Sequence, residues 1–419
     1  TATAVAHSDS LFRFAMVGRP YSVPDLLIEV LTADDNDGNI LNGTPYFQEI
    51  IDGFSQHNVS SPLPEFGIIH APIQNMETVV EPITIETIIL SINQTISIAE
   101  LVYSFGAGTI TTALTPGAGS NEYFGIIPPQ SPGTVITYYI HAVDGDGNEY
   151  FSPSTAPDIQ HFFLIGNTVS FPALFTDDSE ADQGWTLGVP SDGASTGIWV
   201  REDPNGTTNN GQPLQPEDDH TIDGITAFVT GNAPFDGTNA GDDDVDDGTT
   251  TLVTPTMNLL GAVNPVFSYW RWYSNNLGDA PNADDWVVQV TADGQNWFDL
   301  EQTSQSEASW IYKQFLLNQY IEMSDQVQVR FIADDSGDGS LVEAAVDDVF
   351  ILNGISVNLV FGDVDFDGEV SINDVLQIVD YIFGFIQPNG IQLYVADLNQ
   401  DGNLNVIDAL ILIQMILNP

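Results

Sequence analysis

The spacing of apolar residues changes twice along this chain. From about residue 61 to 355, apolar and polar residues alternate in short runs that end at Pro, Gly and Asn, which predicts β-strands joined by turns. Near both ends, apolar residues instead recur three and four positions apart, which predicts amphipathic helices. We therefore expect a mainly β, multidomain protein in four parts: residues 1–60, 61–166, 167–355 and 356–419.

The last part contains one segment written twice, GDVDFDGEVSINDVLQIVDYIF and ADLNQDGNLNVIDALILIQMIL. In each copy, side-chain oxygens stand at loop positions 1, 3, 5, 9 and 12, Gly stands at 6, and position 7 offers its carbonyl. These residues are Asp363, Asp365, Asp367, Glu369, Ser371 and Asp374, then Asp397, Asn399, Asp401, Asn403, Asn405 and Asp408. EF-hand-type loops present oxygens to Ca²⁺ in this order. The alternative is a pair of acidic turns that cap two ordinary helices.

Each loop leads into a helix whose apolar residues have the same offsets in both copies. They are Ile372, Val375, Leu376, Val379, Ile382 and Phe383 in the first copy, and Val406, Ala409, Leu410, Ile413, Ile416 and Leu417 in the second. Neither helix can bury such a face alone, so the two helices are predicted to pack against each other.

This repeat, over roughly residues 358–419, resembles the dockerin module of secreted bacterial proteins. The resemblance implies two bound Ca²⁺ ions and docking onto a cohesin module. Cellulosomal dockerins often carry small hydroxyl residues at loop positions 10 and 11, where this chain has Ile372 and Asn373, then Val406 and Ile407. The calcium expectation therefore carries over, whereas a cohesin partner of the cellulosomal kind does not.

Residues 1–60 are predicted to form two helices, DLLIEVL and a second one that follows a Gly-Thr-Pro start at 43–45. The apolar face of the second helix is Phe47, Ile50, Ile51 and Phe54, and the acidic turn between the helices contains Asp34, Asp35, Asp37 and Asn39. This run resembles the closing segment of thermolysin-like secreted metallopeptidase domains. Those enzymes need an H-E-x-x-H motif, which this chain lacks, so we expect a remnant without peptidase activity.

Residues 61–166 end in TYYIHAVDGDGNEYFSP, which resembles the last hairpin of immunoglobulin-like or fibronectin-type-III modules. The resemblance implies a β-sandwich. Asp144, Asp146 and Asn148 form the turn of that hairpin; they are either calcium ligands or, as we favour, a plain Asp-Gly turn.

Residues 167–355 open with FTDDSEADQGWTLG and close with SLVEAAVDDVFIL. This pairing resembles the MAM-like and carbohydrate-binding-like jelly rolls of secreted bacterial hydrolases and adhesins. In that architecture the first and last strands are neighbours, which implies that Asp178 and Glu180 meet Asp347 or Asp348 around one Ca²⁺. The alternative is a set of turn carboxylates at strand ends. A second acidic run, GDDDVDDG at 241–248, either splays into solvent or holds Ca²⁺.

Aromatic residues concentrate in the strand around PVFSYWRWYSN. Side chains alternate along a strand, so Tyr269, Arg271 and Tyr273 share one face while Trp270 and Trp272 share the other. At least one of these faces must be core. Packing is favoured for most of these rings, and Trp270 and Trp272 are the candidates for stacking on a sugar.

Composition narrows the list of partners. The chain has 59 Asp plus Glu against 6 Lys plus Arg, a net charge of −53, which excludes nucleic acids and anionic membrane surfaces as partners. It contains no cysteine, so disulfides and thiolate metal sites are excluded. No apolar run approaches transmembrane length, so membrane insertion is not expected. Because Ca²⁺ is abundant outside cells, we expect a mature protein of the extracellular space or cell surface.

No nucleophile elbow, thiol, paired histidines or phosphate loop is present, so we expect no enzyme activity. The main hypothesis is a calcium-stabilised structural protein, a subunit of a surface assembly or filament. Its partner is then another extracellular protein, copies of this chain included. The alternative is a polysaccharide-binding or adhesion tail of a secreted hydrolase that docks through its dockerin-like module.

Overall fold

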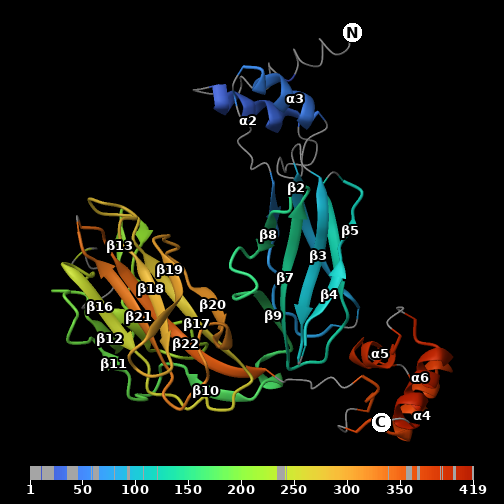
Figure 1. The fold of residues 1–419 in the computed structure, drawn as a ribbon. Helices are drawn as coiled ribbons and strands as arrows, with labels where there is room; N and C mark the ends of the chain where they lie inside the picture. Colours follow the sequence, from blue (N-terminus) through green and yellow to red (C-terminus); the bar gives the residue numbers. More distant parts are fainter. Residues whose placement is uncertain are drawn as a thin grey trace. The chain divides into compact units, whose positions relative to one another are not determined.

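A computed structural model describes residues 11, 23–34, 46–57, 59, 66–79, 81–91, 95–106, 108–119, 121–233, 241, 243–337, 339–354, 361–365, 369–386, 388, 390–399 and 403–417. The chain divides into two compact units, Thr1–Gly166 with Val357–Pro419, and Asn167–Ser356. The fold is mainly β, with two β-sandwiches and helices near both ends (Figure 1). This confirms the predicted fold class. None of the described helices is long and apolar enough to span a membrane.

Both helices predicted near the N-terminus are present, α2 (Val23–Asp34) and α3 (Phe47–Ser55). Leu27 and Leu31 of α2 are fully buried and pack with Ile51 of α3. Asp34 Oδ2 accepts the backbone N–H of Tyr46 at 2.7 Å, which ties the end of α2 to the start of α3. The other members of the predicted acidic turn, Asp35, Asp37 and Asn39, and the helix start at 43–45 lie outside the described residues.

The first sandwich has two antiparallel sheets. One sheet has the order β1-β2-β6-β5, with β1 (Phe66–Ile69), β2 (Ile83–Ser91), β6 (Glu122–Ile127) and β5 (Thr115–Pro116). The other has the order β4-β3-β7-β8, with β9 also paired to β7; its strands are β4 (Ile110–Ala113), β3 (Ile96–Ser104), β7 (Thr134–Asp144), β8 (Glu149–Ser152) and β9 (His161–Ile165). Ile85, Ile89, Tyr138, Ile140 and Phe163 are fully buried members of its core.

The turn after β7 is held by Asp144. Its Oδ1 accepts the backbone N–H groups of Asp146 and Asn148, each at 2.9 Å, and its Oδ2 accepts Asn148 Nδ2 at 2.8 Å. These donors, led by the Asn148 side chain, lower the pKa of Asp144. The carboxylate is therefore engaged as in the plain turn that we favoured.

The second sandwich has two larger antiparallel sheets. The first has the order β12-β15-β22-β17-β20, with β10 also paired to β22; its strands are β10 (Ala173–Asp177), β12 (Trp199–Glu202), β15 (Ala227–Thr230), β22 (Glu343–Gly354), β17 (Asn264–Ser274) and β20 (Ile311–Leu316). The second has the order β11-β16-β21-β18-β19, with β11 (Thr186–Leu187), β16 (Gly248–Val253), β21 (Gln328–Asp335), β18 (Trp286–Thr291) and β19 (Trp297–Thr303). A short hairpin of β13 (Thr208–Asn209) and β14 (Gln212–Pro213) lies apart from both sheets. The pairing of β10 with β22 makes the first and last strands neighbours, as expected.

An ion-pair network crosses the core of this sandwich. Arg271 of β17 is fully buried, and its Nη1 lies 2.6 Å from Glu301 Oε1 of β19, on the facing sheet. Its Nη2 pairs with Glu307. Tyr269 Oη donates to Glu301 Oε2 at 2.5 Å, and Lys313 Nζ lies 3.0 Å from Glu301 Oε1. The two sheets are therefore joined by charge as well as by apolar packing.

The C-terminal segment contains α4 (Ile372–Ile382), α5 (Gly390–Ala396) and α6 (Val406–Leu417) (Figure 1). The predicted helix pair is present, and α5 adds a third helix that the repeat did not predict. Its Val395 and Ala396 are fully buried in the core, together with Ile378 of α4 and Leu412 of α6.

The predicted helix faces are wrong in part. Val375 and Ala409 are buried as expected, but six of the twelve predicted residues are more than half exposed: Ile372, Leu376, Phe383, Val406, Leu410 and Leu417. The buried stripe of α4 instead runs through Asp374, Val375, Ile378 and Tyr381. Asp374 lies on the buried stripe because its carboxylate accepts backbone N–H groups of the loop. This side of α4 therefore faces the loop.

Candidate functional site

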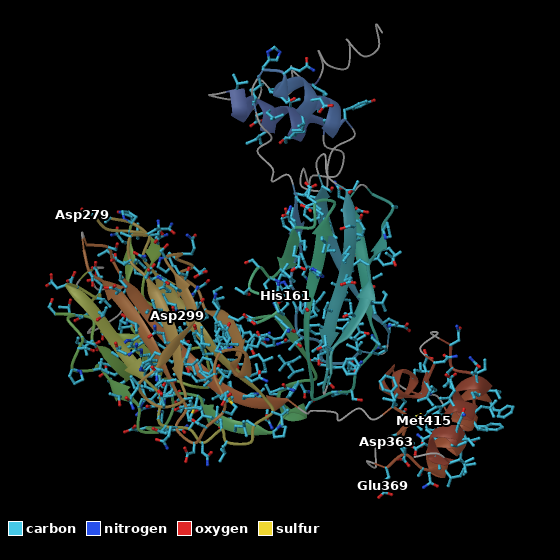
Figure 2. All side chains as sticks on the ribbon, viewed as in Figure 1. His161, Asp279, Asp299, Asp363, Glu369 and Met415 are labelled. Atoms are coloured by element: carbon cyan, nitrogen blue, oxygen red, sulfur yellow. The ribbon has the colours of Figure 1, made fainter. Side chains whose placement is uncertain are left out.

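The first predicted calcium loop is organised around Asp374. Its Oδ1 accepts the backbone N–H of Val364 at 2.8 Å, and its Oδ2 accepts that of Ser371 at 2.8 Å. Ser371 Oγ in turn accepts the N–H of Asn373, which completes a capping box at the start of α4. One carboxylate oxygen each from Asp363, Asp365 and Asp374 lies within 4.8 Å of the others. Figure 2 marks this loop by Asp363 and Glu369.

Three hard oxygens gathered at the start of a helix fit Ca²⁺. Asp363 and Asp374 are buried, and in the absence of a cation such close carboxylates repel one another. The sixth-position Gly368 and the predicted fifth-position ligand Asp367 lie outside the described residues. Glu369 and Ser371 are described and follow them as the spacing requires.

The second loop repeats this arrangement with Asp408. The carboxylate of Asp408 is fully buried and accepts the N–H groups of Leu398 at 3.0 Å and Asn405 at 2.9 Å. These bonds match those that Asp374 makes with Val364 and Ser371. Asp397, Asn399 and Asn403 belong to the described residues, whereas Asp401 does not. The two copies therefore have equivalent carboxylate-to-backbone hydrogen bonds as well as the same spacing of oxygen-bearing residues.

The four carboxylates predicted to share a Ca²⁺ in the second sandwich lie around residues 218–226. Asp347 Oδ2 accepts the backbone N–H of His220 at 2.9 Å, and Asp348 Oδ2 lies 2.6 Å from His220 Nδ1. Glu180 Oε1 accepts the N–H groups of Ile225 and Thr226 at 2.7 and 2.8 Å. Asp178 contributes its backbone carbonyl, which accepts the Thr221 hydroxyl at 3.4 Å. The structure thus brings all four residues to one loop, where they mostly accept hydrogen bonds from the protein.

Asp219 joins this group, and the prediction missed it. Its Oδ2 is buried without a hydrogen-bond partner. A Cβ at Gly224 would lie 2.2 Å from that oxygen and 2.8 Å from Glu180 Oε1, so the two carboxylates face the same glycine. Burial, followed by the charge of Asp347, raises the pKa of Asp219 to about 7. The signal was available in the sequence as the acidic run before His220, but its proximity to Asp347 required the fold.

The described members of the acidic run at 241–248 differ in exposure, from the buried Asp244 to the exposed Asp247. Asp246 Oδ2 accepts the Thr196 hydroxyl at 3.1 Å, and Asp247 Oδ2 accepts the Ser195 hydroxyl at 2.8 Å. Asp244 is buried. The pKa of the fully buried Glu343 is raised well above its usual range, first by burial and then by the negative charge of Asp244.

The aromatic strand has the two faces that alternation predicted. Tyr269, Arg271 and Tyr273 are fully buried in the core, while Trp270 and Trp272 lie half-buried on the outer face of the sheet. Trp270 stacks on His220, with ring centroids 3.7 Å apart. Trp272 packs edge-on against Trp310 at 6.0 Å. Tyr312, 41% exposed, lies 5.5 Å from Trp270 and extends this aromatic surface toward solvent.

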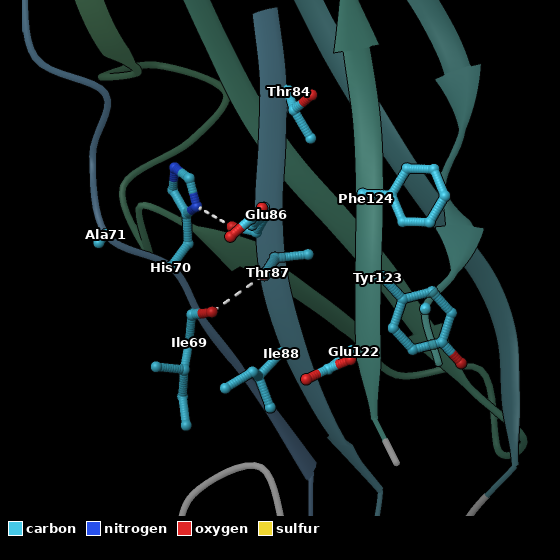
Figure 3. A pocket seen from close by; sticks show the side chains of 11 residues that line it. Ile69, His70, Ala71, Thr84, Glu86, Thr87, Ile88, Glu122, Tyr123 and Phe124 are labelled. Carbon is cyan, nitrogen blue, oxygen red and sulfur yellow. Dashed lines mark hydrogen bonds between the residues drawn. The ribbon is translucent and has the colours of Figure 1, made fainter. Parts of the chain in front are cut away.

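The first sandwich contains a pair of partly buried histidines that the prediction did not use. His70 Nε2 lies 2.8 Å from Tyr138 Oη, and His161 Nε2 lies 3.2 Å from Ser152 Oγ. Their ring centroids are 5.3 Å apart. A hollow of about 540 Å³ opens beside His70 (Figure 3). The hydrogen bonds drawn there, from His70 to Glu86 O and from Thr87 Oγ1 to Ile69 O, tie β1 to β2.

This pair predicts an acid-sensitive sandwich. Burial, followed by the charge of His70, lowers the pKa of His161 from 6.5 to about 4. The unfolded chain therefore binds more protons between these pH values, so stability present above pH 6.5 is lost as pH falls toward 4. We expect a loss of about 1–2 kcal/mol after solvent screening. Calorimetry of the full chain should show that His161→Gln flattens this dependence and that His57→Gln, at an exposed site, does not; equal slopes in both variants would contradict it.

The family model of the dockerin type I domain matches residues 361–417. This confirms the dockerin resemblance of that segment. The immunoglobulin-like, MAM-like and metallopeptidase resemblances are not confirmed and stay predictions. No curated protein sequence gives a match.

Among solved structures, the chain is similar to TmCBM61 in complex with β-1,4-galactotriose, at 11% identity over 43% of this chain and 99% of that chain, with a TM-score of 0.27. It is similar to the xylan-binding domain from CBM 22 at 10% identity over 43% and 95%, with a TM-score of 0.26. It is also similar to the K3 cleaved adhesin domain of Lys-gingipain from Porphyromonas gingivalis w83, at 12% identity over 41% and 100%, with a TM-score of 0.22. TM-scores of this size carry no argument about what this chain binds.

Proposed function

We propose that this chain is a non-catalytic extracellular protein that docks onto a partner protein through residues 361–417 and holds polysaccharide on its second sandwich. The dockerin match carries this proposal, because a dockerin attaches a chain to another protein rather than performing chemistry. The proposal therefore follows the alternative hypothesis, a polysaccharide-binding module that docks, rather than the structural filament. Docking to copies of this chain is not part of the proposal.

The exposed apolar residues of α4 and α6 support docking to a protein. Ile372 and Leu376 of the first copy, and Val406 and Leu410 of the second, are all 59–60% exposed. They occupy equivalent positions in the repeat, so each copy offers the same pair of apolar side chains. Apolar side chains repeated at this exposure are typical of an interface core, and they favour a partner with an apolar surface over one that reads hydroxyl groups.

Calcium is the ion we propose for both loops, since their ligands are hard oxygens at EF-hand spacing. In each loop, the position-12 aspartate would hold the ion while its backbone bonds fix the start of the helix. We propose a further Ca²⁺ beside Glu180, Asp219 and Asp347, where the unpartnered Asp219 oxygen provides the support.

The half-buried aromatic surface supports polysaccharide binding. The rings of Trp270 and Tyr312 lie close together on the outer sheet face, and Trp310 packs beside Trp272 there. Flat aromatic rings contribute binding area at low entropic cost. The donors and acceptors nearby, among them His220 and Asp348, are suited to sugar hydroxyls.

The test is retention of the full chain on insoluble xylan, galactan and cellulose. The double substitution Trp270→Ala with Tyr312→Ala is expected to weaken retention at least about tenfold, which corresponds to ~1.4 kcal/mol. Trp297→Ala is the matched control, because Trp297 is also half-exposed but lies on the facing sheet beneath Arg330. No retention of the parent chain on any polysaccharide would overturn the carbohydrate part and leave the docking part standing.

A further inference from the structure

Three unpartnered oxygens are buried in residues at one end of the second sandwich. Asn275 directly follows β17, Asp284 precedes β18, and Asp335 ends β21. Their exposures are 0%, 7% and 2%. Asn275 Oδ1, Asp284 Oδ2 and Asp335 Oδ2 each lack a hydrogen-bond partner. A buried oxygen without a donor is unfavourable, so three in one region require an explanation.

The orientation of the Asn275 amide is fixed by its neighbour. Asn275 Nδ2 donates to the backbone carbonyl of Asp284 at 2.5 Å, and Tyr273 Oη donates to the same carbonyl at 3.1 Å. Turning the amide around would place Oδ1 against that carbonyl oxygen, which is repulsive. Oδ1 is therefore the acceptor that remains available.

The loops that carry Asp284 and Asp335 are joined. The backbone N–H of Asp279 donates to Gly339 O at 2.9 Å, and Ser340 Oγ donates to Ala280 O at 2.7 Å. Asp279 is labelled at this end of the sandwich in Figure 2. Burial and the nearby charge of Asp284 raise the pKa of Asp335 to about 6, with smaller contributions from Asp246 and Asp334.

No Lys, Arg or His of the described residues pairs with the carboxylates of Asp284 and Asp335. The whole chain has only six Lys and Arg, and the buried Arg271 is already paired with Glu301 and Glu307. Neutral groups do not donate hydrogen bonds to Asn275 Oδ1, Asp284 Oδ2 or Asp335 Oδ2 either.

We propose that Asn275, Asp284 and Asp335 bind a calcium ion that locks the 275–285 loop to the 335–341 loop. Two carboxylates match the charge of a divalent cation, and an amide oxygen is a common third ligand for calcium. Mg²⁺ fits less well, because it retains several waters and avoids cages built from protein oxygens. This site shares no residue with the group around Asp347, so the ion it binds is additional to the one proposed there.

Native mass spectrometry of the full chain in calcium counts the ions directly. We expect the double variant Asp284→Asn with Asp335→Asn to bind one Ca²⁺ fewer than the parent. The matched control is Asp285→Asn with Asp334→Asn, which makes the same charge change one residue away; Asp285 accepts Gln302 Nε2 and Asp334 accepts the Ser336 hydroxyl. An unchanged count in the first variant would overturn the proposal.

Thermal unfolding gives a second readout. All seven tryptophans lie between residues 185 and 310, so tryptophan fluorescence of the full chain follows this unit alone. In calcium, the Asn double variant should unfold about 5–10 °C below the parent. In chelator the order should reverse, because the variant removes carboxylate repulsion. A variant more stable than the parent in both buffers indicates a repulsive acid pair without an ion and overturns the proposal, as does an equal shift with Mg²⁺.

Hydrogen exchange of the parent chain keeps the test independent of whether the variants fold. Calcium should slow exchange in peptides that cover 275–285 and 335–341. Equal exchange in these peptides with and without calcium would overturn the site.

Discussion

Replacing Arg271 with leucine is expected to destabilise the second sandwich by about 3–5 kcal/mol. The guanidinium is fully buried between Glu301 and Glu307, so its loss leaves two carboxylates near the core without their partner. Among the described residues, Lys313 pairs with Glu301 alone, at 3.0 Å, so it cannot replace the guanidinium beside Glu307. The measurement is chemical denaturation of the full chain followed by tryptophan fluorescence, which reports this unit alone.

Arg330→Leu is the matched control for that change. Arg330 is half-exposed, stacks over Trp297 at 4.2 Å and makes no ion pair with Glu301. We expect it to cost about 1 kcal/mol or less. Adding Glu301→Gln to Arg271→Leu should recover part of the stability, because it removes one stranded charge. Equal costs for the two arginine variants would show that the network does not hold the sheets together.

Asp374→Ala is expected to abolish calcium binding in the first dockerin loop. Asp374 is the proposed position-12 ligand and also accepts N–H groups from Val364 and Ser371. Its loss therefore removes an ion ligand and the cap of α4 together, at about 0.5–2 kcal/mol for the cap alone. Outer-sphere changes weaken metal sites by about 10–100-fold, and loss of a ligand should exceed that. Calorimetric calcium titration of the full chain should show one strong site fewer.

The control is Asp380→Ala, on the same helix but outside the loop. It should leave the number of strong sites and their affinities unchanged. Asp408→Ala should repeat the effect in the second loop, because Asp408 makes the equivalent bonds to Leu398 and Asn405. Unaltered calcium affinity in both aspartate variants would mean that the loops are acidic turns, the alternative left open by the sequence.

The sequence determined those features that depend on local spacing. The repeat at Asp363 and Asp397 predicted two equivalent loops, because an EF-hand-type loop takes its ligands from one short stretch. Alternation around Trp270 predicted which side chains share a face, because a strand has a fixed period of two. Alternation left open which of the two faces lies in the core. In the structure the core face is the one that carries Tyr269, Arg271 and Tyr273.

Tertiary structure decided what depends on residues distant in the chain. The buried stripe of α4 differs from the apolar pattern because α5 and the inward Asp374 determine which side is covered. Asp219 lies near Glu180 in a loop that also contacts Asp347, because Asp347 accepts the N–H of His220 from 127 residues further along the chain. Asn275 follows β17, Asp284 precedes β18 and Asp335 ends β21, and no spacing in the sequence relates the three residues. The spacing of residues over short stretches of sequence determines local geometry. The burial of a charge and the identity of its neighbours depend instead on how the sheets pack.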